Sequence, residues 1–348
     1  MTNLNRTIGQ LAEDELLARI IPQLPAGRTV IDNGDDAAVL PADDGSVVAC
    51  TDVMVEDRHF RTAWSTGGDI GWRVAMQNLS DISAMGAAGT QLLIGLVMPP
   101  STTLAWVEDF ARGLRQACEA GAFAWGSPVG VAGGDLSGGE KIMVSVTALG
   151  SLCGRKPLTR AGARPGDTVA VAGTLGFSAA GLALATAGKI PARLADDWQD
   201  LSESGASADQ WAQYAWHIYR RPQPPLTAGV SAADVGASAA MDISDGLVRD
   251  LGRLARASGV SIELTPPCDL PGLVSIAESL APSEGKALAN SWWHSGGEDH
   301  ALLATFHSGT ELPDGFTAIG RVLQDCEGGA LTGIDPEAAR GWDHFGQG

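Results

Sequence analysis

Acidic residues beside glycines, or at the ends of apolar segments, are the side chains in this sequence best placed to do chemistry. Ordinary surface carboxylates lie on helix faces, whereas these occupy positions typical of turns and strand ends. Carboxylates gathered in one place repel one another unless cations lie between them, and oxygen donors favour Mg²⁺, Ca²⁺ or Mn²⁺ over Zn²⁺. The pattern therefore predicts a site for hard divalent cations. It occurs in six segments, 33–36, 50–52, 78–81, 133–135, 241–246 and 296–299.

Each segment taken alone also has an ordinary structural explanation. Gly-Asp pairs are most often turns, Asp81 suits the polar face of a helix, and Asp52 suits the end of a strand. Asp242 and Asp245 resemble a helix N-terminus, where such side chains accept hydrogen bonds from free N–H groups. However, Asp242 directly follows the apolar run 239–241. We therefore expect a carboxylate at the end of a buried strand, where α/β proteins hold ligands.

Three further segments have weaker chemical signals. The Gly-rich segment 173–176 resembles a phosphate-binding loop but lacks the Gly-Lys-Ser/Thr ending, so a tight turn from strand to helix is favoured. His59 lies in a polar stretch and by itself indicates a solvated histidine. Trp342, close to the C-terminus, is by itself typical of an aromatic side chain that packs on the core.

Apolar periodicity predicts the elements that must position these groups. Short apolar runs bounded by turn residues predict strands, and apolar residues repeating every three or four positions predict helices. The predicted strands are 47–50, 92–97, 141–147, 168–172, 260–264 and 301–306. The predicted helices are 72–85, 104–118, 179–187 and 247–257, and a solvated loop is predicted over 195–210.

Composition and charge exclude several classes of protein. With 348 residues, 45% of them hydrophobic, the chain suits two globular domains, which we place at 1–150 and 151–348. The 41 acidic residues against 23 basic ones give a net charge of −18, which disfavours binding to nucleic-acid phosphates. No apolar run approaches the roughly 18 residues that span a bilayer. The N-terminus lacks a signal-peptide pattern, and five scattered cysteines form no CxxC pair, so we expect a cytoplasmic protein without a membrane partner.

Taken in chain order, the motifs also carry a family resemblance. The matching segments are 34–38, 51–52, 59–60, 78–86, 133–135, 158–160, 242–247, 295–299 and 341–345. Together they resemble the thiamine-monophosphate kinase family, in the superfamily of aminoimidazole ribonucleotide synthetase and selenophosphate synthetase. The ordered set is specific, and its Asn-Leu-Ser-Asp, Ser-Gly-Gly-Glu-Asp and Asp-His-Phe elements separate this family from its relatives.

The resemblance implies a fold, a reaction and a set of site residues. The fold is α/β (α+β) with two PurM-like domains, the N-terminal one binding ATP and magnesium and forming a homodimer through its sheet. The reaction is transfer of the γ-phosphoryl group of ATP to thiamine monophosphate, which yields thiamine diphosphate and ADP and is the last step of thiamine diphosphate biosynthesis. The implied magnesium ligands are Asp36, Thr51, Asp52, Asp81, Asp135, Asp242 and Asp245; the ATP contacts are Gly134, Asp135, Arg160 and Ser244; the substrate contacts are His59, Glu298 and Trp342.

The mechanism expected from these residues relies on positioning and charge neutralisation. No side chain stands out as a general base, and the second pKa of a substrate phosphate lies near about 6, so we expect direct in-line transfer without a phosphoenzyme. The acidic segments should then converge on one cleft. One departure from the family is Cys50, where Ser or Thr is usual, because a thiol is a poor magnesium ligand. A metal contact there would have to come from the backbone carbonyl or be absent.

Two alternatives stay open at this point. The chain could be another ATP-using member of the superfamily, such as aminoimidazole ribonucleotide synthetase. It could also be a non-catalytic, carboxylate-rich metal-binding protein, although repeated ligand loops are missing from the sequence. Selenophosphate synthetase would have a reactive N-terminal cysteine, and the hydrogenase-maturation relative would end in a cysteine-bearing tail. Neither feature is present.

Overall fold

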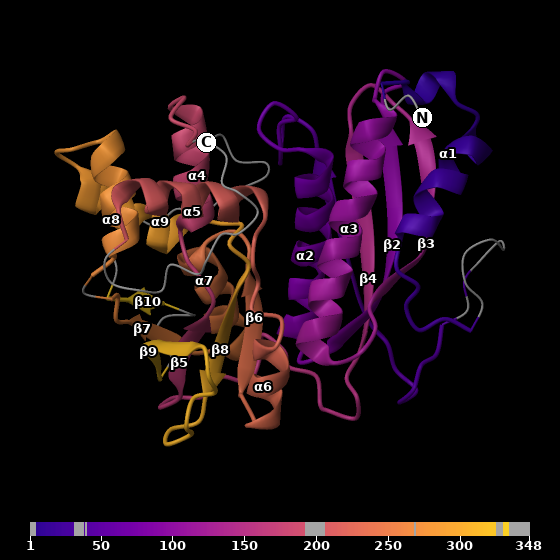
Figure 1. Ribbon diagram of the computed structural model, residues 1–348. Helices are drawn as coiled ribbons and strands as arrows, with labels where there is room; N and C mark the ends of the chain where they lie inside the picture. The colour runs from indigo at the N-terminus through magenta and orange to yellow at the C-terminus, as the bar shows by residue number, and fades with distance from the viewer. Residues whose placement is uncertain are drawn as a thin grey trace. The chain divides into compact units, whose positions relative to one another are not determined.

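A computed structural model describes residues 5–30, 38, 40–191, 206–267, 269–324 and 330–333 (Figure 1). The chain divides into two compact units, Met1–Pro157 and Leu158–Gly348. Each unit has a sheet of its own, so the protein is a mixed α/β molecule, as predicted. The division falls after Pro157, whereas the sequence-based division was placed after residue 150. No described helix is long and apolar enough to cross a membrane.

The N-terminal unit contains a four-stranded sheet with the strand order β1-β4-β2-β3. Strands β1 and β2 both pair antiparallel with β4, whereas β2 and β3 are parallel. Helices α2 and α3 lie side by side along the sheet, and α2 packs on β1, β2 and β4 (Figure 1). The bounds are α1 Glu13–Ile20, β1 Val48–Val55, α2 Gly67–Ala84, β2 Ala88–Met98, α3 Leu104–Trp125, β3 Gly130–Gly138 and β4 Met143–Ser151, with 3-10 turns at Ile8–Gln10 and Ile21–Gln23.

Local sequence explains how α2 and α3 form and pack. Thr66 and Asp69 make a capping box at the start of α2, in which each side chain accepts a backbone N–H of the other. Glycines let the two helices approach closely, because a Cβ on Gly113 would lie 2.1 Å from the Gly68 carbonyl oxygen. Helix α2 therefore lies firmly against both its neighbour and the sheet.

The two faces of this sheet differ in exposure. Met54 and Val146 point toward α2 and are 1% and 0% exposed. On the opposite face Val53, Leu93 and Met143 are 45%, 37% and 38% exposed. We call this second face the open face. These three side chains give the open face exposed apolar surface.

The C-terminal unit contains a six-stranded sheet with the strand order β10-β7-β9-β5-β8-β6. Among the described strands of this unit, only β10 and β7 pair in parallel. A hydrophobic core joins the sheet to helices α4, α5, α7, α8 and α9. The strands are β5 Thr168–Ala172, β6 Ala239–Ile243, β7 Ser261–Leu264, β8 Ala301–Phe306, β9 Phe316–Leu323 and β10 Leu331–Thr332. The helices are α4 Phe177–Thr186, α5 Ala208–Arg220, α6 Ala228–Asp234, α7 Leu247–Ser258, α8 Pro271–Leu280 and α9 Gly285–Ser295.

The predicted elements are found with shifted ends, and one prediction is wrong in part. The loop expected over 195–210 includes residues 195–205, which lie outside the described residues. Its last residues, from Ala208, instead begin α5, because Ser207 and Gln210 form a capping box there. Helix α3 also runs to Trp125, beyond the predicted end at residue 118. Helices α1, α5, α6, α8 and α9 and strands β3, β9 and β10 were not predicted.

Candidate functional site

Three loops meet at one end of the C-terminal sheet, where β5 and β6 finish and β8 begins. These loops contain several of the predicted site residues. Strand β8 pairs antiparallel with both β5 and β6, with Ala172 opposite Leu302 and Ile243 opposite Ala301. The carboxyl ends of β5 and β6 therefore lie beside the start of β8. Consequently the loops 173–176, 244–246 and 295–300 are neighbours, although they are far apart in the sequence.

Two of these loops contact each other through their backbones. The Glu298 N–H donates to the Ser244 carbonyl oxygen over 2.9 Å, and a Cβ on Gly297 would lie 2.3 Å from that oxygen. Glu298 and His300 have φ angles of 66° and 56°, a left-handed conformation that is uncommon for residues other than glycine. Such backbone strain is often stored at functional sites. The structure thus places the predicted substrate residue Glu298 beside the predicted ATP residue Ser244.

Asp242 is a buried strand residue, as the apolar run before it predicted. It is 8% exposed and alternates with Met241 and Ile243, which belong to the hydrophobic core, so its side chain leaves the other face of the sheet. Its Oδ2 lies 3.2 Å from Nδ1 of His300, itself 6% exposed. Sequence reasoning missed His300. The available signal was its position directly after the acidic motif, at the start of a strand.

Asp245 is held by arginines of α7. Its Oδ2 lies 2.8 Å from Nη1 of Arg253 and 3.8 Å from Nε of Arg249. The alternative that Asp242 and Asp245 cap a helix is wrong, because α7 begins after Gly246, which carries no side-chain cap.

The N–H groups of the turn between β6 and α7 donate instead to Asp250, a residue inside α7. Its Oδ2 accepts the N–H groups of Ser244 and Asp245 at 3.1 and 3.0 Å. Asp250 is 0% exposed, and burial raises its pKa to about 6. A buried N–H without an acceptor typically costs about 1–3 kcal/mol, so Asp250 stabilises the turn appreciably. Nothing in the local motif singled it out.

The Gly-rich loop 173–176 is a tight turn, as favoured by the sequence. The negative group that its amides bind is the carboxylate of Asp299. Asp299 accepts the N–H groups of Gly176, Phe177 and Ser178 at 3.1–3.2 Å, and the Thr174 hydroxyl at 3.2 Å. Burial raises the pKa of Asp299 to about 7, while these hydrogen bonds oppose the rise. The free amides at the start of α4 are thus used by a carboxylate.

Arg160 does not lie near Ser244, although both are predicted ATP contacts. The Ala240 N–H donates to the carbonyl oxygen of Thr159 over 2.9 Å, which places this segment beside the amino end of β6. Ser244 follows the carboxyl end of the same strand. The Arg160 carbonyl oxygen accepts the hydroxyl of Ser258, at the end of α7, and its side chain is exposed.

In the N-terminal unit, two predicted magnesium ligands flank Cys50. The Cys50 thiol lies 3.3 Å from the carbonyl oxygen of Asn78. Burial raises its pKa, and the negative charges of Asp81 and Asp52 raise it further. The thiol therefore stays protonated at neutral pH. Asp52 of β1 and Asp81 of α2 thus approach each other on the face of the sheet that α2 covers.

Thr51 and Asp135 lie on the open face, away from Asp52. Thr51 alternates with Asp52 along β1, and its hydroxyl donates to the Val146 carbonyl oxygen at 3.0 Å. In register, Asp135 of β3 pairs with Gly95, and Gly95 pairs with Ser145 of β4. Gly134 occupies the other row and is exposed.

Strands β1 and β3 are the two edges of the four-stranded sheet. Three inter-strand spacings of about 4.8 Å put these edges roughly 14 Å apart. Ligands of one magnesium ion lie about 2.1 Å from it. One copy of this unit therefore does not bring Asp52 and Asp135 to the same ion.

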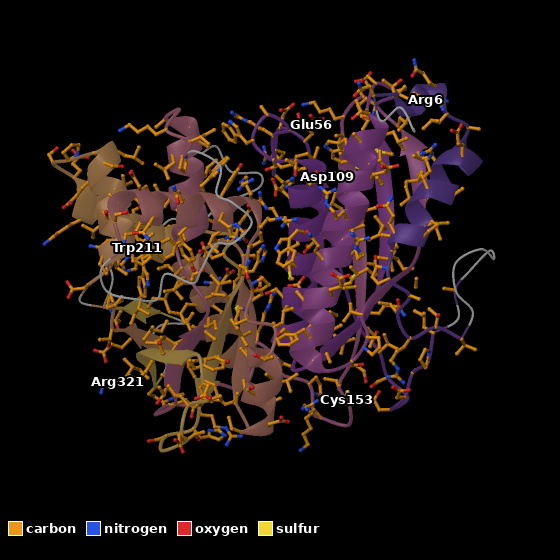
Figure 2. All side chains as sticks on the ribbon, in the orientation of Figure 1. Arg6, Glu56, Asp109, Cys153, Trp211 and Arg321 are labelled. Atoms are coloured by element: carbon orange, nitrogen blue, oxygen red, sulfur yellow. The ribbon has the colours of Figure 1, made fainter. Side chains whose placement is uncertain are left out.

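His59 is oriented by the end of β1. Its Nδ1 accepts the Val55 N–H at 3.0 Å, so the ring proton of the neutral form is on Nε2. The loop also contains Glu56, which is labelled in Figure 2. Its Oε2 accepts the Ile142 N–H at 3.1 Å and so fixes the loop further. His59 is thus an ordered loop residue rather than a freely solvated one. The two remaining predicted site residues, Asp36 and Trp342, lie outside the described residues.

Magnesium suits this donor set. Among the described residues, no group of three or more His, Cys, Asp or Glu side chains is placed to hold a metal ion. The carboxylates come instead in small groups, such as Asp52 with Asp81. Magnesium is commonly held by one or two carboxylates, with phosphate oxygens and waters completing its octahedron. The site therefore fits an ion that arrives with a phosphorylated substrate.

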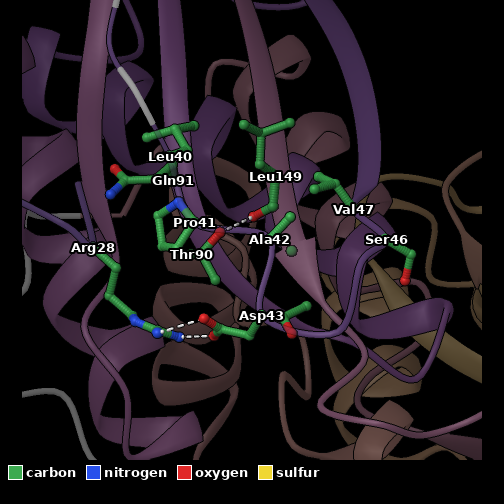
Figure 3. Close-up of a pocket in the computed structure, with 12 residues that line it drawn as sticks. Arg28, Leu40, Pro41, Ala42, Asp43, Ser46, Val47, Thr90, Gln91 and Leu149 are labelled. Carbon is green, nitrogen blue, oxygen red and sulfur yellow. Dashed lines mark hydrogen bonds and ion pairs between the residues drawn. The ribbon is translucent and has the colours of Figure 1, made fainter. Parts of the chain in front are cut away.

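A small pocket lies elsewhere in the N-terminal unit and contains none of the predicted site residues (Figure 3). Arg28 and Asp43 form an ion pair at its rim, and the Thr90 hydroxyl donates to the Leu149 carbonyl oxygen at 3.1 Å. Gln91 lines it with a buried side-chain amide that has no hydrogen-bond partner.

Comparison with known proteins identifies the family of this chain. The profile of the family described as AIR synthase related protein, N-terminal domain, matches residues 34–152. A thiamine-monophosphate kinase of Mycobacterium tuberculosis H37Rv is 38% identical over 345 residues, covering 98% of this chain and 94% of that protein. The chain belongs to the thiamine-monophosphate kinase family.

Solved structures of this family have the same fold. The crystal structure of thiamine-monophosphate kinase from Stenotrophomonas maltophilia K279a is 28% identical, with a TM-score of 0.71, covering 93% of this chain and 97% of that one. A structure described as AaThiL complexed with AMPPCP and TMP is 29% identical, with a TM-score of 0.71, covering 95% of both chains. The expected fold class is therefore confirmed.

Proposed function

We infer that this chain transfers the γ-phosphoryl group of ATP to thiamine monophosphate, giving thiamine diphosphate and ADP. The observation that carries this inference is the near full-length identity of 38% to a thiamine-monophosphate kinase. It is supported by the likeness to a structure complexed with AMPPCP and TMP. The same near full-length relatives favour this kinase over aminoimidazole ribonucleotide synthetase and over a non-catalytic metal-binding protein.

The proposed magnesium ligands are carboxylates that the structure orients. Asp52 and Asp81 would hold magnesium in the N-terminal unit, and Asp242 and Asp245 in the C-terminal unit. Bound magnesium would neutralise the charge of the phosphate groups. Asp36 and Thr51 remain candidate ligands from their motifs.

Nucleotide and substrate contacts follow the same motifs. We assign ATP contacts to Gly134, Asp135, Arg160 and Ser244, and the N-terminal unit is the proposed ATP- and magnesium-binding domain. His59 would donate from Nε2–H to the substrate, and Glu298 would contact it beside Ser244. Trp342 is assigned to the substrate by its motif.

The transfer is proposed to be direct and in line. The substrate phosphate is its own nucleophile and is largely ionised at neutral pH, so no general base is needed. Neither histidine near the motifs stands out as a nucleophile for a phosphoenzyme: His300 is buried beside Asp242, and His59 is proposed to donate from Nε2–H while its Nδ1 accepts a backbone N–H. Positioning and charge neutralisation would then supply the rate enhancement.

We propose that the chain forms a homodimer through the open face. Val53, Leu93 and Met143 supply exposed apolar surface there. Thr51 and Asp135 are the predicted ligands on this face and belong to opposite edge strands. A second copy packed on the open face would bring the partner's Asp135 toward β1, which a single copy does not do.

A cytoplasmic location is proposed from the cysteines. Cys50, Cys118 and Cys153 are free thiols in the described part of the chain, as a reducing compartment requires. In that compartment the protein would catalyse the last step of thiamine diphosphate biosynthesis.

The reaction is tested with purified protein, ATP and Mg²⁺, by comparing thiamine monophosphate, thiamine and no acceptor. We expect thiamine diphosphate, identified by mass, only with the monophosphate. ADP release that is independent of the acceptor, or no turnover, would contradict the proposed function. A stable labelled protein after incubation with γ-labelled ATP would contradict direct transfer alone.

A further inference from the structure

One ion-pair network in the C-terminal unit extends beyond the predicted site residues. It joins Asp245, Asp250 and Arg253, and only Asp245 belongs to a motif that suggested function. Asp250 is 0% exposed, and the side chain of Arg253 is 31% exposed. A carboxylate this deeply buried has a role in the protein that its immediate sequence does not reveal.

The two oxygens of Asp250 have separate tasks. Oδ2 accepts the N–H groups of Ser244 and Asp245, so it determines the shape of the turn between β6 and α7. Oδ1 accepts from Nη1 of Arg253 at 2.6 Å. Because three donors engage the buried carboxylate, it is not available to a metal ion or a nucleotide.

Arg253 connects this buried carboxylate to the exposed edge of the turn. The same Nη1 atom lies 2.8 Å from Oδ2 of Asp245, whose side chain is 15% exposed. Arg249 adds a second positive charge, 3.8 Å from the same oxygen. Asp245 is therefore oriented before any ligand arrives, and an ion that binds it acts on a carboxylate already partly neutralised by arginine.

We propose that Asp250 and Arg253 are positioning residues for the nucleotide–magnesium complex: Asp250 shapes the Ser244–Asp245 turn, and Arg253 aims the Asp245 carboxylate. The inference rests on the proposed function, because it takes Asp245 as a ligand of the magnesium that accompanies ATP. Disruption should weaken binding of that complex selectively. Thiamine monophosphate should be affected less, since Asp250 and Arg253 act directly on Ser244 and Asp245, whereas the proposed substrate contact Glu298 reaches this turn through the Ser244 carbonyl oxygen.

The test substitutes Asp250→Asn in the full chain. Calorimetry measures the Kd of the magnesium complex of a non-hydrolysable ATP analogue, and steady-state kinetics measures KM for ATP and for thiamine monophosphate. We expect about a tenfold rise in that Kd and in KM for ATP, with KM for thiamine monophosphate changed less than about twofold.

The matched control is Asp167→Asn. Asp167 is also buried, at 3% exposure, and accepts the Arg164 N–H at 2.9 Å, but it precedes β5 at the end of the strand away from the Gly-rich turn. This variant should lose stability without losing affinity for the complex. Equal Kd values for the two variants would overturn the proposal, even if the wild type phosphorylates thiamine monophosphate normally.

A second pair of variants covers the case in which Asp250→Asn does not fold. Arg253→Met leaves the hydrogen bonds from the Ser244 and Asp245 amides to Asp250 in place, and it removes the ion pairs of Arg253 with Asp250 and Asp245. Arg256→Met, one helical turn further along α7, is its control. We expect Arg253→Met to raise the Kd at least threefold relative to Arg256→Met. If the wild type does not phosphorylate thiamine monophosphate but the two variants still differ in Kd in this way, the proposed function fails and the positioning role stands.

Discussion

The two units handle their acidic motif residues differently. In the C-terminal unit the motif carboxylates have protein partners: Asp242 contacts His300, and Asp245 contacts Arg253. In the N-terminal unit Asp52 and Asp81 flank a thiol whose pKa is raised by burial and, further, by their charges. The first arrangement is organised by hydrogen bonds and ion pairs within the fold. In the N-terminal arrangement two carboxylates are close enough to influence the same thiol. A cation bound there would neutralise the negative charge of both.

This difference indicates where each unit depends on something outside itself. The C-terminal cluster is complete within one unit, because its loops meet at the same end of one sheet. The N-terminal ligands lie on both faces and both edges of one sheet, so they need ions and, as proposed, a second copy. Three predictions test this contrast.

The largest effect is expected for the N-terminal carboxylates. Asp52→Ala and Asp135→Ala should each lower the rate by more than about 100-fold, because charge stabilisation supplies most of the catalysis of such transfers. Thr51, unlike Asp52, lies on the open face with Asp135, so Thr51→Val is the variant to pair with Asp135→Ala. Mixed dimers of these two should exceed both single variants and approach about one quarter of the wild-type activity, since half of the dimers are mixed and one of their two sites is intact. Co-expression with two different affinity tags and an ADP-release assay measure this.

The control combines Asp52→Ala with Asp81→Ala. Both residues approach Cys50 within one copy, so every site of that mixed dimer lacks one carboxylate and activity should stay low. Failure of the Thr51→Val and Asp135→Ala pair to regain activity, with dimers confirmed by the tags, would contradict the shared site. The contrast between a self-contained and a partner-dependent cluster would then be lost.

A smaller effect concerns acid stability of the C-terminal unit. Burial, helped by the charges of Arg220 and Arg221, lowers the pKa of His217 from 6.5 to about 4. Between these values the unfolded chain binds a proton that the folded chain does not, so this histidine costs stability as pH falls from about 7 to 4. As pH falls over that range, the free energy of unfolding of His217→Gln should therefore rise relative to that of the wild type by about 2–3 kcal/mol.

Urea unfolding at pH 7 and at pH 4 measures the difference. His307→Gln is the control, because the side chain of His307 is 49% exposed, and its difference from the wild type should change less. A His217→Gln difference that is independent of pH would contradict the buried, neutral state of this histidine. Comparing the two variants isolates this group from the buried carboxylates of the same unit.

The smallest effect is chemical and concerns the N-terminal unit. A raised pKa leaves Cys50 almost without thiolate at pH 7.5, whereas Cys153 is exposed. Since the thiolate is the reactive form, iodoacetamide should label Cys153 at least about tenfold faster than Cys50. Peptide mass mapping over time gives both rates. Equal rates would contradict the placement of Asp52 and Asp81 beside this thiol.

Sequence reasoning located the motifs but not the residues that hold them. His300, Asp250 and Arg253 were missed because their roles depend on contacts across loops or on burial. In the sequence, Asp250 looks like any acidic residue in the first turn of a helix. Only the structure shows that it is buried and that both of its oxygens accept hydrogen bonds. The helix-cap interpretation of Asp245 failed for the same reason, because a buried carboxylate from inside α7 supplied the acceptor.

The sequence by itself determined the strands that apolar runs mark, the order of the acidic motifs and, through that order, the family. These features are local, since periodicity and motif spacing are written along the chain. Tertiary structure alone decided that the loop with Glu298 meets the turn with Ser244, and that Asp52 and Asp135 are kept apart. Strand order and burial are non-local, because they depend on which strands pair and which helices cover them. The same acidic motifs therefore became a closed cluster in one unit and an open set of ligands in the other.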